Sequence, residues 1–158
     1  MSDTVTFEDV VQYPTLRRNE DHAQVTALQY LLRHRGHAIA ADGIFGPRTE
    51  AAVRAFQASV NLTADGIVGR RTWPAVVVTV RRGSTGDAVR AVQFQDWVRD
   101  GTGEMPKVFD GIFGPRTEAS VRGFQQAMAA SFPADHIAVD GIVGPVTWRG
   151  LVGGFLLL

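Results

Sequence analysis

The chain has 158 residues, of which 45% are hydrophobic and 20% charged, a balance typical of a soluble globular protein and not of a disordered one. Sixteen basic residues balance sixteen acidic ones, so no net charge attracts the protein to nucleic acid or to anionic lipid. Because cysteine is absent, the sequence excludes disulfides, a thiolate nucleophile and any cysteine-based metal site.

The two ends of the chain carry no targeting or membrane signal that we can identify. Residues 1–13, which we assign as an N-terminal extension, lack the basic start and apolar core of a signal peptide. The apolar stretch at 150–158 is too short to span a bilayer. We therefore expect a protein that is cytoplasmic as synthesised and has no membrane span. Its apolar C-terminal tail, 153–158, would suit either docking to a partner or covering an open edge of the core.

Three helices are predicted in the first half of the chain. The first ends near Gly36 and carries hydrophobic residues at three- and four-residue spacing, at Val25, Leu28, Leu31 and Leu32. The second starts at Pro47, since proline fits a first helical turn, where its missing N–H would have had no partner. Its buried stripe is formed by Ala52, Val53 and Phe56. The third is short, from Thr72 to about Val77, with Trp73 as its core anchor.

The second half of the chain repeats this plan. The ten residues DGIFGPRTEA occur at 42–51 and again, unchanged, at 110–119. Fourteen of the sixteen positions in 42–57 and 110–125 are identical, and the two exceptions are Ala52/Ser120 and Ala55/Gly123. A shorter motif, DGIVG, follows each copy at 65–69 and 140–144. The spacing between the repeats grows along the chain, so the insertions fall in loops between packed elements.

These repeats predict an all-α protein built from two tandem small three-helix bundles, each with its own core. We place the first module at 14–78 and the second at 79–152. In the second module, Val121 and Phe124 belong to the buried stripe and Trp148 is the core anchor. The connection at 76–80 is short and β-branched, which favours bundles that are fixed against one another.

The three motifs together resemble the peptidoglycan-binding domain family. They read RR…VxxLQ or VxxVQ, then DGIFGPxTxxxVxxFQ, then DGIVGxxTW, in this order in both halves. The family is a three-helix fold found beside bacterial and phage cell-wall hydrolases. The resemblance implies non-catalytic binding of peptidoglycan, through its glycan or its stem peptide, that positions an associated hydrolase or particle on the wall. The protein would then act at the wall after lysis or as part of a particle.

Two other functions remain open at this point. One is a structural adaptor of a phage tail or contractile injection particle, which would use the same fold for protein–protein contacts. The other is an accessory fragment of a wall-lytic enzyme. The partners expected are therefore peptidoglycan, a cell-wall hydrolase or a phage-tail-like particle, and no nucleic acid.

The sequence departs from the family pattern at three places. Residues 19–22 are charged where the second copy has the glycine-containing turn at 83–86. In the first helix of the second copy, Gln95 and Asp96 stand where two leucines are expected, unless an insertion lets Trp97 and Val98 take over. The segment 127–138 is also seven residues longer than its counterpart. We therefore expect unequal binding by the two modules.

The resemblance also assigns candidate ligand contacts by position. In the first module they are Asp42, Phe45, Arg48, Asp65 and Arg70, and in the second they are Asp110, Phe113, Arg116 and Asp140. Arginines would suit stem-peptide carboxylates, and an exposed aromatic ring would suit a sugar face. The alternative is scaffold, because an Asp-Gly pair forms turns in which the carboxylate accepts a backbone N–H two residues on. The aromatic rings would then belong to the core.

Catalytic interpretations find little support in the residues. The four histidines are His22, His34, His37 and His136. Of these, His34 and His37 are three residues apart, but Gly36 intervenes and the second copy has no equivalent pair. No serine lies in a Gly-x-Ser-x-Gly elbow. Spacing alone leaves a carboxylate pair such as Glu20 and Glu104 open, but the modules are too small to enclose a glycan cleft. We predict no enzyme, no metal and no cofactor.

Overall fold

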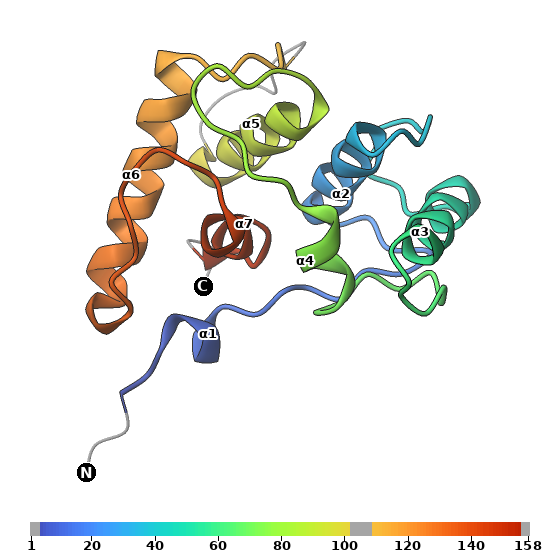
Figure 1. The fold of residues 1–158 in the computed structure, drawn as a ribbon, viewed down its shortest axis with the longest axis horizontal. Coiled ribbons are helices and arrows are strands. Elements are labelled where there is room, and N and C mark those ends of the chain that lie inside the picture. The colour runs from blue at the N-terminus through green and yellow to red at the C-terminus, as the bar shows by residue number, and fades with distance from the viewer. Residues whose placement is uncertain (1–3, 102–108, 156–158) are drawn as a thin grey trace.

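The computed structural model describes residues 4–101 and 109–155, and both repeats are helical (Figure 1). The described residues form seven α-helices and a 3-10 turn: α1 Phe7–Val10, α2 Ala23–His34, α3 Pro47–Ser59, α4 Thr72–Val76, α5 Asp87–Asp100, α6 Pro115–Ser131, η1 Pro133–Asp135 and α7 Pro145–Val152. Within this part of the chain, extended segments pair only through isolated bridges, such as Leu16 with Val68. The predicted all-α class, with three helices in each repeat, is confirmed.

Glycine and proline set several helix boundaries, including those predicted at Gly36 and Pro47. Helices α3, α6 and α7 each begin with proline at the first position, after an extended glycine N-cap. Helix α2 ends at His34, and Gly36 just beyond it has a φ of +96°, a conformation that glycine adopts at little cost. Local chain chemistry therefore accounts for where these helices start and stop.

The two predicted tryptophan anchors lie at equivalent places in the two repeats. Trp73 on α4 and Trp148 on α7 are both fully buried. Each indole also donates a hydrogen bond to the chain that leads into its repeat, Trp73 to the carbonyl of Pro14 at 2.8 Å and Trp148 to that of Val78 at 2.7 Å. Each anchor thus closes its bundle by joining the last helix to the first segment.

The two bundles share one hydrophobic interior. Helices α2 and α5 pack against each other at the centre, with α3 and α4 on one side and α6 and α7 on the other (Figure 1). The buried side chains of both repeats form a single connected cluster. The guanidinium of Arg35 also donates to the carbonyls of residues 75–77, at the end of α4 and the start of the connection. The expectation of a separate core in each bundle is therefore wrong, because the first helices of the repeats bury their apolar faces against each other.

Residues 4–16, which we call the N-terminal strap, hold the second repeat. The ring of Phe7 packs edge-on against Phe132, with centroids 5.5 Å apart, and the Phe7 N–H donates to Asp135 at 2.9 Å. From α7, Arg149 donates to the carbonyls of Val11 at 2.6 Å and Glu8 at 2.8 Å. The longer segment after α6 supplies Phe132 and Asp135, so the insertion seen in the sequence builds the seat for α1.

The strap then continues onto the first repeat (Figure 1). Tyr13 stacks on Trp73 with a centroid distance of 6.3 Å and an interplanar angle of 9°. Beyond it, Leu16 exchanges backbone hydrogen bonds of 2.9 and 2.8 Å with Val68. The strap therefore ties the two repeats together, a role that its sequence did not predict.

At the other end of the chain, Phe155 covers an edge of the core. Its ring lies 5.9 Å from that of Phe124 and 5.8 Å from that of Phe132, and only 8% of the residue is exposed. Of the two alternatives for the apolar tail, Phe155 thus follows the one in which the tail covers an edge of the core. Residues 156–158 lie outside the described part of the chain, so docking by them stays a prediction.

We expect Phe7→Ala to lower the free energy of unfolding by about 3 kcal/mol, because it removes a buried ring from the seat formed by α6 and η1. Val5→Ala is the matched control, since Val5 is 62% exposed and its truncation should change stability by less than about 0.5 kcal/mol. Urea denaturation of both variants measures the difference. Equal effects would contradict a strap that is packed onto the second repeat.

Candidate functional site

The first Asp-Gly turn is held by one buried side-chain amide. Gln29 on α2 is 1% exposed, and its Nε2 lies 3.0 Å from the Asp42 carboxylate, the Ile44 carbonyl and the Thr49 hydroxyl. Its Oε1 accepts the Gly43 N–H at 2.9 Å. The amide therefore joins a helix, the following turn and the start of the next helix. We call this arrangement a glutamine node.

The described residues contain four such nodes, two in each repeat. The other three consist of Gln57 with the turn at 65–67 and Thr72, Gln93 with the turn at 110–112 and Thr117, and Gln125 with the turn at 140–142 and Thr147. In each node the glutamine precedes the Asp-Gly turn and the threonine lies within the first turn of the next helix. The repeat seen in the sequence is therefore a repeat of one hydrogen-bonded unit.

The four turn aspartates have the same structural task. In each turn, one carboxylate oxygen accepts the backbone N–H two residues on, at 2.9–3.0 Å. For Asp42, the bond from the Ile44 N–H, followed by that from Gln29, holds the pKa of the carboxyl below its ordinary value. The bonds from Ile112 and Gln93 lower the pKa of Asp110 in the same way. Scaffold is thus a sufficient explanation of these aspartates, and ligand contact by them stays a prediction.

The aromatic candidates of the first turns belong to the core. Phe45 is fully buried and Phe113 is 1% exposed. A ring in this position has no face available to a sugar. Both phenylalanines are therefore core residues, as the alternative interpretation expects.

The arginine candidates are placed differently, since all three are exposed. Arg48 and Arg116 follow the first proline of α3 and α6, at the same place in the two repeats, and Arg70 precedes α4. Within the described residues, none of the three takes part in an ion pair. Their guanidinium groups are therefore available to an anionic partner.

The sequence interpretation missed Arg71. In the nodes, the residue immediately before the threonine is Arg48, Arg71, Arg116 or Val146. Because the threonine points inward to its glutamine, the preceding residue is directed to the surface. Counting six positions from each turn aspartate would have identified Arg71, and not Arg70, as the equivalent of Arg48 and Arg116.

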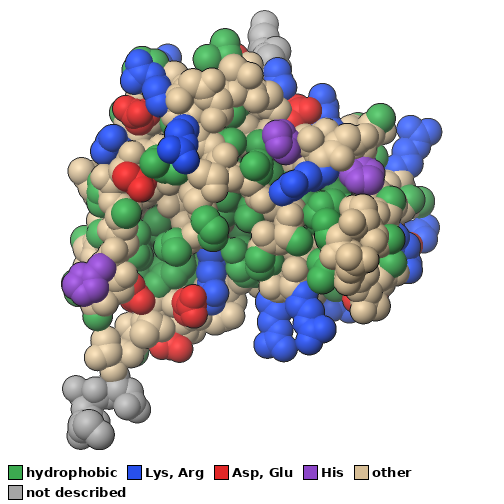
Figure 2. All heavy atoms as spheres, viewed as in Figure 1, with side chains coloured by type: hydrophobic (Ala, Val, Ile, Leu, Met, Phe, Trp, Pro, Cys, Tyr) green, Lys and Arg blue, Asp and Glu red, His purple; other side chains and the backbone are tan. Residues whose placement is uncertain are grey.

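Grooves lie beside these nodes. The groove beside the Gln93 node has a volume of about 620 Å³ and is lined by Arg116, Asp110 and Trp97 among others. A groove of about 640 Å³ beside the Gln57 node is lined by Arg70, Arg71 and Tyr13 of the strap. Two further ones are a hollow of about 210 Å³ at Asp140 and a groove of about 470 Å³ at Arg48. On the face drawn in Figure 2, the basic side chains lie mostly around the margin of a central apolar area.

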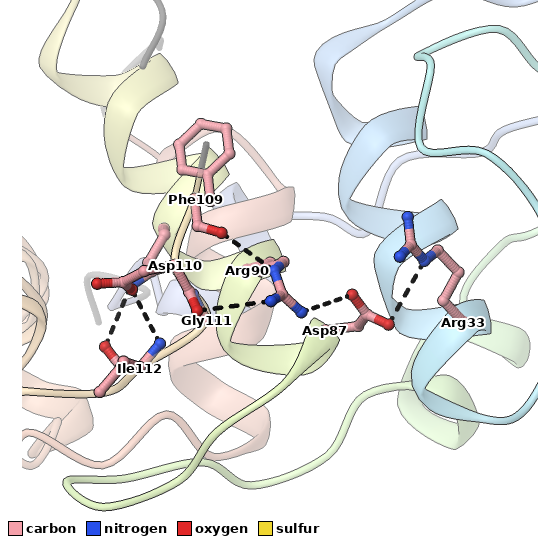
Figure 3. A network of polar contacts seen from close by, with 8 residues as sticks. Arg33, Asp87, Arg90, Phe109, Asp110, Gly111 and Ile112 are labelled. Atoms are coloured by element: carbon pink, nitrogen blue, oxygen red, sulfur yellow. Dashed lines mark hydrogen bonds and ion pairs between the residues drawn. The ribbon is translucent and has the colours of Figure 1, made fainter. Parts of the chain in front are cut away.

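A charged network supports the turn beside the 620 Å³ groove (Figure 3). From α2 of the first repeat, Arg33 approaches Asp87 to 3.4 Å, and Asp87 pairs with Arg90 at 3.0 Å. The Nε of Arg90 then donates to the carbonyl of Phe109 at 3.0 Å, directly before the Asp-Gly turn. The equivalent positions in the first repeat hold Ala23 and Thr26. The second repeat's turn is thus held from the first repeat, a contact between segments too distant in sequence to be predicted.

The described residues offer neither a cluster of metal ligands nor a membrane-spanning helix. Within 4–101 and 109–155, no three or more histidine, aspartate or glutamate side chains gather as a metal site would require. No helix in these ranges combines the length and hydrophobicity needed to cross a bilayer. Glu104, one member of the carboxylate pair considered above, lies outside the described residues.

Comparison with known families agrees with the repeated nodes. The family described as "Putative peptidoglycan binding domain" matches residues 21–76 and again 100–151. These two matches cover most of the chain and correspond to the two repeats. The chain belongs to this family, in two tandem copies. The N-terminal strap lies outside both matched segments.

Relatives and solved structures match parts of the chain. The zinc D-Ala-D-Ala carboxypeptidase of Streptomyces albus G is 35% identical over 105 residues, which are 66% of this chain and 37% of that protein. An uncharacterized protein of Kitasatospora aureofaciens is 39% identical over 67 residues, 42% of this chain and 49% of that protein. The chain thus spans less than half the length of these relatives.

Two solved structures have low overall similarity. A peptidoglycan-binding protein from Clostridioides difficile, in complex with glutamine hydroxamate, is 34% identical, with 40% of each chain covered and a TM-score of 0.40. The endolysin of Burkholderia phage AP3 is 26% identical, with 77% of this chain and 53% of that chain covered, and a TM-score of 0.40.

We expect Gln125→Leu to lower the free energy of unfolding by about 2–4 kcal/mol, because the node would keep buried N–H and C=O groups without partners. The neighbouring Gln126 is exposed on the same helix, so Gln126→Leu should have little effect. Thermal and urea denaturation of the pair measure the contrast. A Gln125→Leu variant as stable as Gln126→Leu would show that the node does not hold the turn.

The lowered pKa values predict acid sensitivity. Asp42 and Asp110 bind protons less readily when folded, so their contribution to stability is present above the ordinary value of 3.8 and is lost as the pH falls through the lower folded pKa. The double variant Asp42→Asn, Asp110→Asn keeps the acceptor oxygens but cannot titrate. Between about pH 5 and pH 2 it should lose less stability than the parent. The exposed Asp21→Asn controls for removal of a negative charge, and identical pH profiles for parent and double variant would refute the assignment.

Proposed function

We propose that this protein binds bacterial peptidoglycan without cleaving it, and that it positions an associated hydrolase or particle on the wall. The observation that carries the proposal is the paired placement of Arg48 and Arg116. Both are exposed, free of ion pairs among the described residues, and set beside a groove by the same glutamine node in each repeat. Membership in the peptidoglycan-binding family supplies the class of ligand.

The chemistry of these positions suits the stem peptide. A guanidinium group binds a carboxylate through two parallel hydrogen bonds, and stem peptides carry carboxylates. Arg48 and Arg116 lie on helix starts whose position is set by glutamine nodes, so little backbone entropy is lost in placing them. Arg70 and Arg71 offer the same chemistry at the groove beside the strap.

Two sites on one body bind a polymer more tightly than either does alone. Because the repeats share a core, Arg48 and Arg116 are held at a fixed separation. Binding at one site therefore raises the effective concentration at the other, and the avidity can increase by ~100-fold or more. Cutting the chain into halves would expose the shared core, so the two sites are better compared by single substitutions in the intact chain.

The proposed lack of catalytic activity rests on the hydrogen bonds of the turn aspartates and the glutamines, which are made within the fold. The turn aspartates accept backbone N–H groups, and the glutamine side chains of the nodes hold those turns. A general acid or base must instead face the substrate with a free proton position. These residues therefore serve the fold, and a separate hydrolase would supply the chemistry.

We expect the double variant Arg48→Ala, Arg116→Ala to bind insoluble peptidoglycan sacculi about tenfold more weakly than the parent, since each lost guanidinium contact contributes ~1 kcal/mol or less at an exposed site. Co-sedimentation with sacculi measures the affinity, and raising the salt concentration should weaken it as well. The single variants show whether both repeats contribute.

The matched control is Arg17→Ala, Arg81→Ala, which removes two exposed arginines from equivalent positions that line none of the grooves described above. Equal loss in both double variants would indicate non-specific charge attraction. Release of soluble wall fragments by the purified protein would contradict a non-catalytic role. Failure of the parent protein to sediment with sacculi would favour the adaptor alternative.

A further inference from the structure

The second repeat places polar side chains where the first repeat has apolar ones. Asp96 and Ser120 occupy the positions of Leu32 and Ala52, which are 1% and 7% exposed in the core of the first repeat. Helix α5 carries no insertion before Asp96, so Trp97 and Val98 do not replace the missing leucines. Serine in place of alanine at 120 is one of only two differences between the two sixteen-residue stretches. It contacts a second difference, Asp96 in place of leucine, on the facing helix.

These residues form one cluster with Arg99. The carboxylate of Asp96 accepts hydrogen bonds from the Ser120 hydroxyl and from Arg99, and Arg99 also donates to Ser120 at 3.0 Å. The Arg99 guanidinium lies over the ring of Phe124, 4.9 Å from its centroid. The side chains of Arg99 and Asp96 are only 18% and 22% exposed. Burial raises the pKa of Asp96, and the bonds from Ser120 and Arg99 oppose this effect.

Stability does not explain such a cluster. Removing two charges from water costs free energy that their mutual attraction often does no more than offset, and well-packed apolar residues serve equally well. The first repeat shows that Leu32 and Ala52 fill the same space. Among the described residues, Nη1 of Arg99 is buried without a hydrogen-bond partner, so the protein does not fully satisfy the group. Charged side chains that are mostly buried and incompletely hydrogen-bonded are typical of binding sites.

The cluster lines the 620 Å³ groove together with Trp97 and Arg116. The node at this groove is also the most open one, since Gln93 and Thr117 are partly exposed while Gln29, Gln57 and Gln125 are each 1% exposed. The groove at Arg48 in the first repeat is lined by His37 and Ile39 and, on α3, by Ala51, Ala52 and Ala55, with no carboxylate or hydroxyl side chain. The two repeats therefore offer different chemistry at equivalent places.

We propose that the groove formed by Asp96, Trp97, Arg99 and Ser120 is a sugar-binding site, specific to the second repeat, for a neutral amino sugar of the glycan strand. Asp96 and Arg99 neutralise each other, so the cluster itself gives no net attraction to a charged ligand group; the other charges that line the groove, on Asp100, Asp110 and Arg116, lie outside the cluster. Hydroxyl and acetamido groups both donate and accept hydrogen bonds, which a carboxylate–guanidinium–hydroxyl set can satisfy. Trp97 adds an aromatic wall for the apolar face of the ring.

This inference rests on the proposed wall-binding function and extends it by separating the two repeats. The second repeat contacts the glycan at the polar groove, in addition to any stem peptide at Arg116. The first repeat has no equivalent of Asp96, Trp97 or Ser120, because its corresponding residues are Leu32, Arg33 and Ala52. The two modules thus bind unequally because their grooves differ in polarity.

The test replaces the cluster with the first repeat's residues, in Asp96→Leu, Ser120→Ala. Tryptophan fluorescence provides the readout, because Trp73 and Trp148 are fully buried and Trp97 lines the groove. The probes are glycan strands stripped of stem peptide by an amidase, with the lactyl carboxylates that this exposes amidated so that every sugar is neutral, and free stem peptide. We expect stripped glycan to protect Trp97 of the parent from acrylamide quenching, and the double variant to lose this protection by at least tenfold in apparent affinity. Gln126→Ala, on the exposed side of α6, should behave as the parent.

The outcomes separate this proposal from the general one. If parent and double variant bind stripped glycan equally, the sugar site is refuted while retention by sacculi still supports wall binding. Stem peptide bound at Arg116 of the same groove should affect parent and double variant alike. If the parent does not bind sacculi at all, both proposals fail. Should the double variant not unfold cooperatively, Ser120→Ala alone removes one hydroxyl and should still weaken glycan binding severalfold. Trp97→Phe should abolish the quenching signal, and a signal that persists would refute the assignment to this groove.

Discussion

A buried primary amide that holds an Asp-Gly turn is the interaction on which the rest of this structure depends. A glutamine side chain donates and accepts without carrying a charge, so it can be buried with its bonds satisfied at little electrostatic cost. In each node the amide fixes the turn, the carboxylate of the turn and a threonine on the next helix. The direction in which each new helix leaves the turn is thereby set. The node thereby also positions the exposed residue before the threonine, which is an arginine in three of the four nodes.

The nodes alone do not hold the two repeats together. That is done by the pairing of α2 with α5, by the ion pairs from Arg33 through Asp87 to Arg90, and by the strap that links Phe132 to Trp73 through α1 and Tyr13. A small three-helix bundle buries a limited apolar area, and the gain from sharing a core is correspondingly large. The result is a rigid pair of grooved surfaces, which suits binding to a repetitive polymer.

Within this common frame, a few side chains make the repeats different. At the groove between the first and second helix of each repeat, the first repeat has several alanines beside Arg48 and His37, and the second has the Asp96–Arg99–Ser120 cluster. A duplicated fold can change ligand chemistry in this way without disturbing its nodes, because the groove residues lie beside the hydrogen-bonded unit and not within it. Fold and specificity are thus carried by different positions of the same helices.

The sequence by itself determined the helices, the turns and the family, because these depend on contacts within a few residues. The hydrophobic spacing of α2, the Gly-Pro start of α3 and the Asp-Gly turn at 42–43 all follow from local backbone sterics and hydrogen bonding. Only the tertiary structure decided that Phe45 and Phe113 are core residues, that both bundles share one interior, and that the strap joins them. It alone brought Asp96 against Ser120 from the facing helix, and Arg149 against Val11 from the far end of the chain. Such contacts join segments far apart in sequence, and no local preference of either segment encodes its partner.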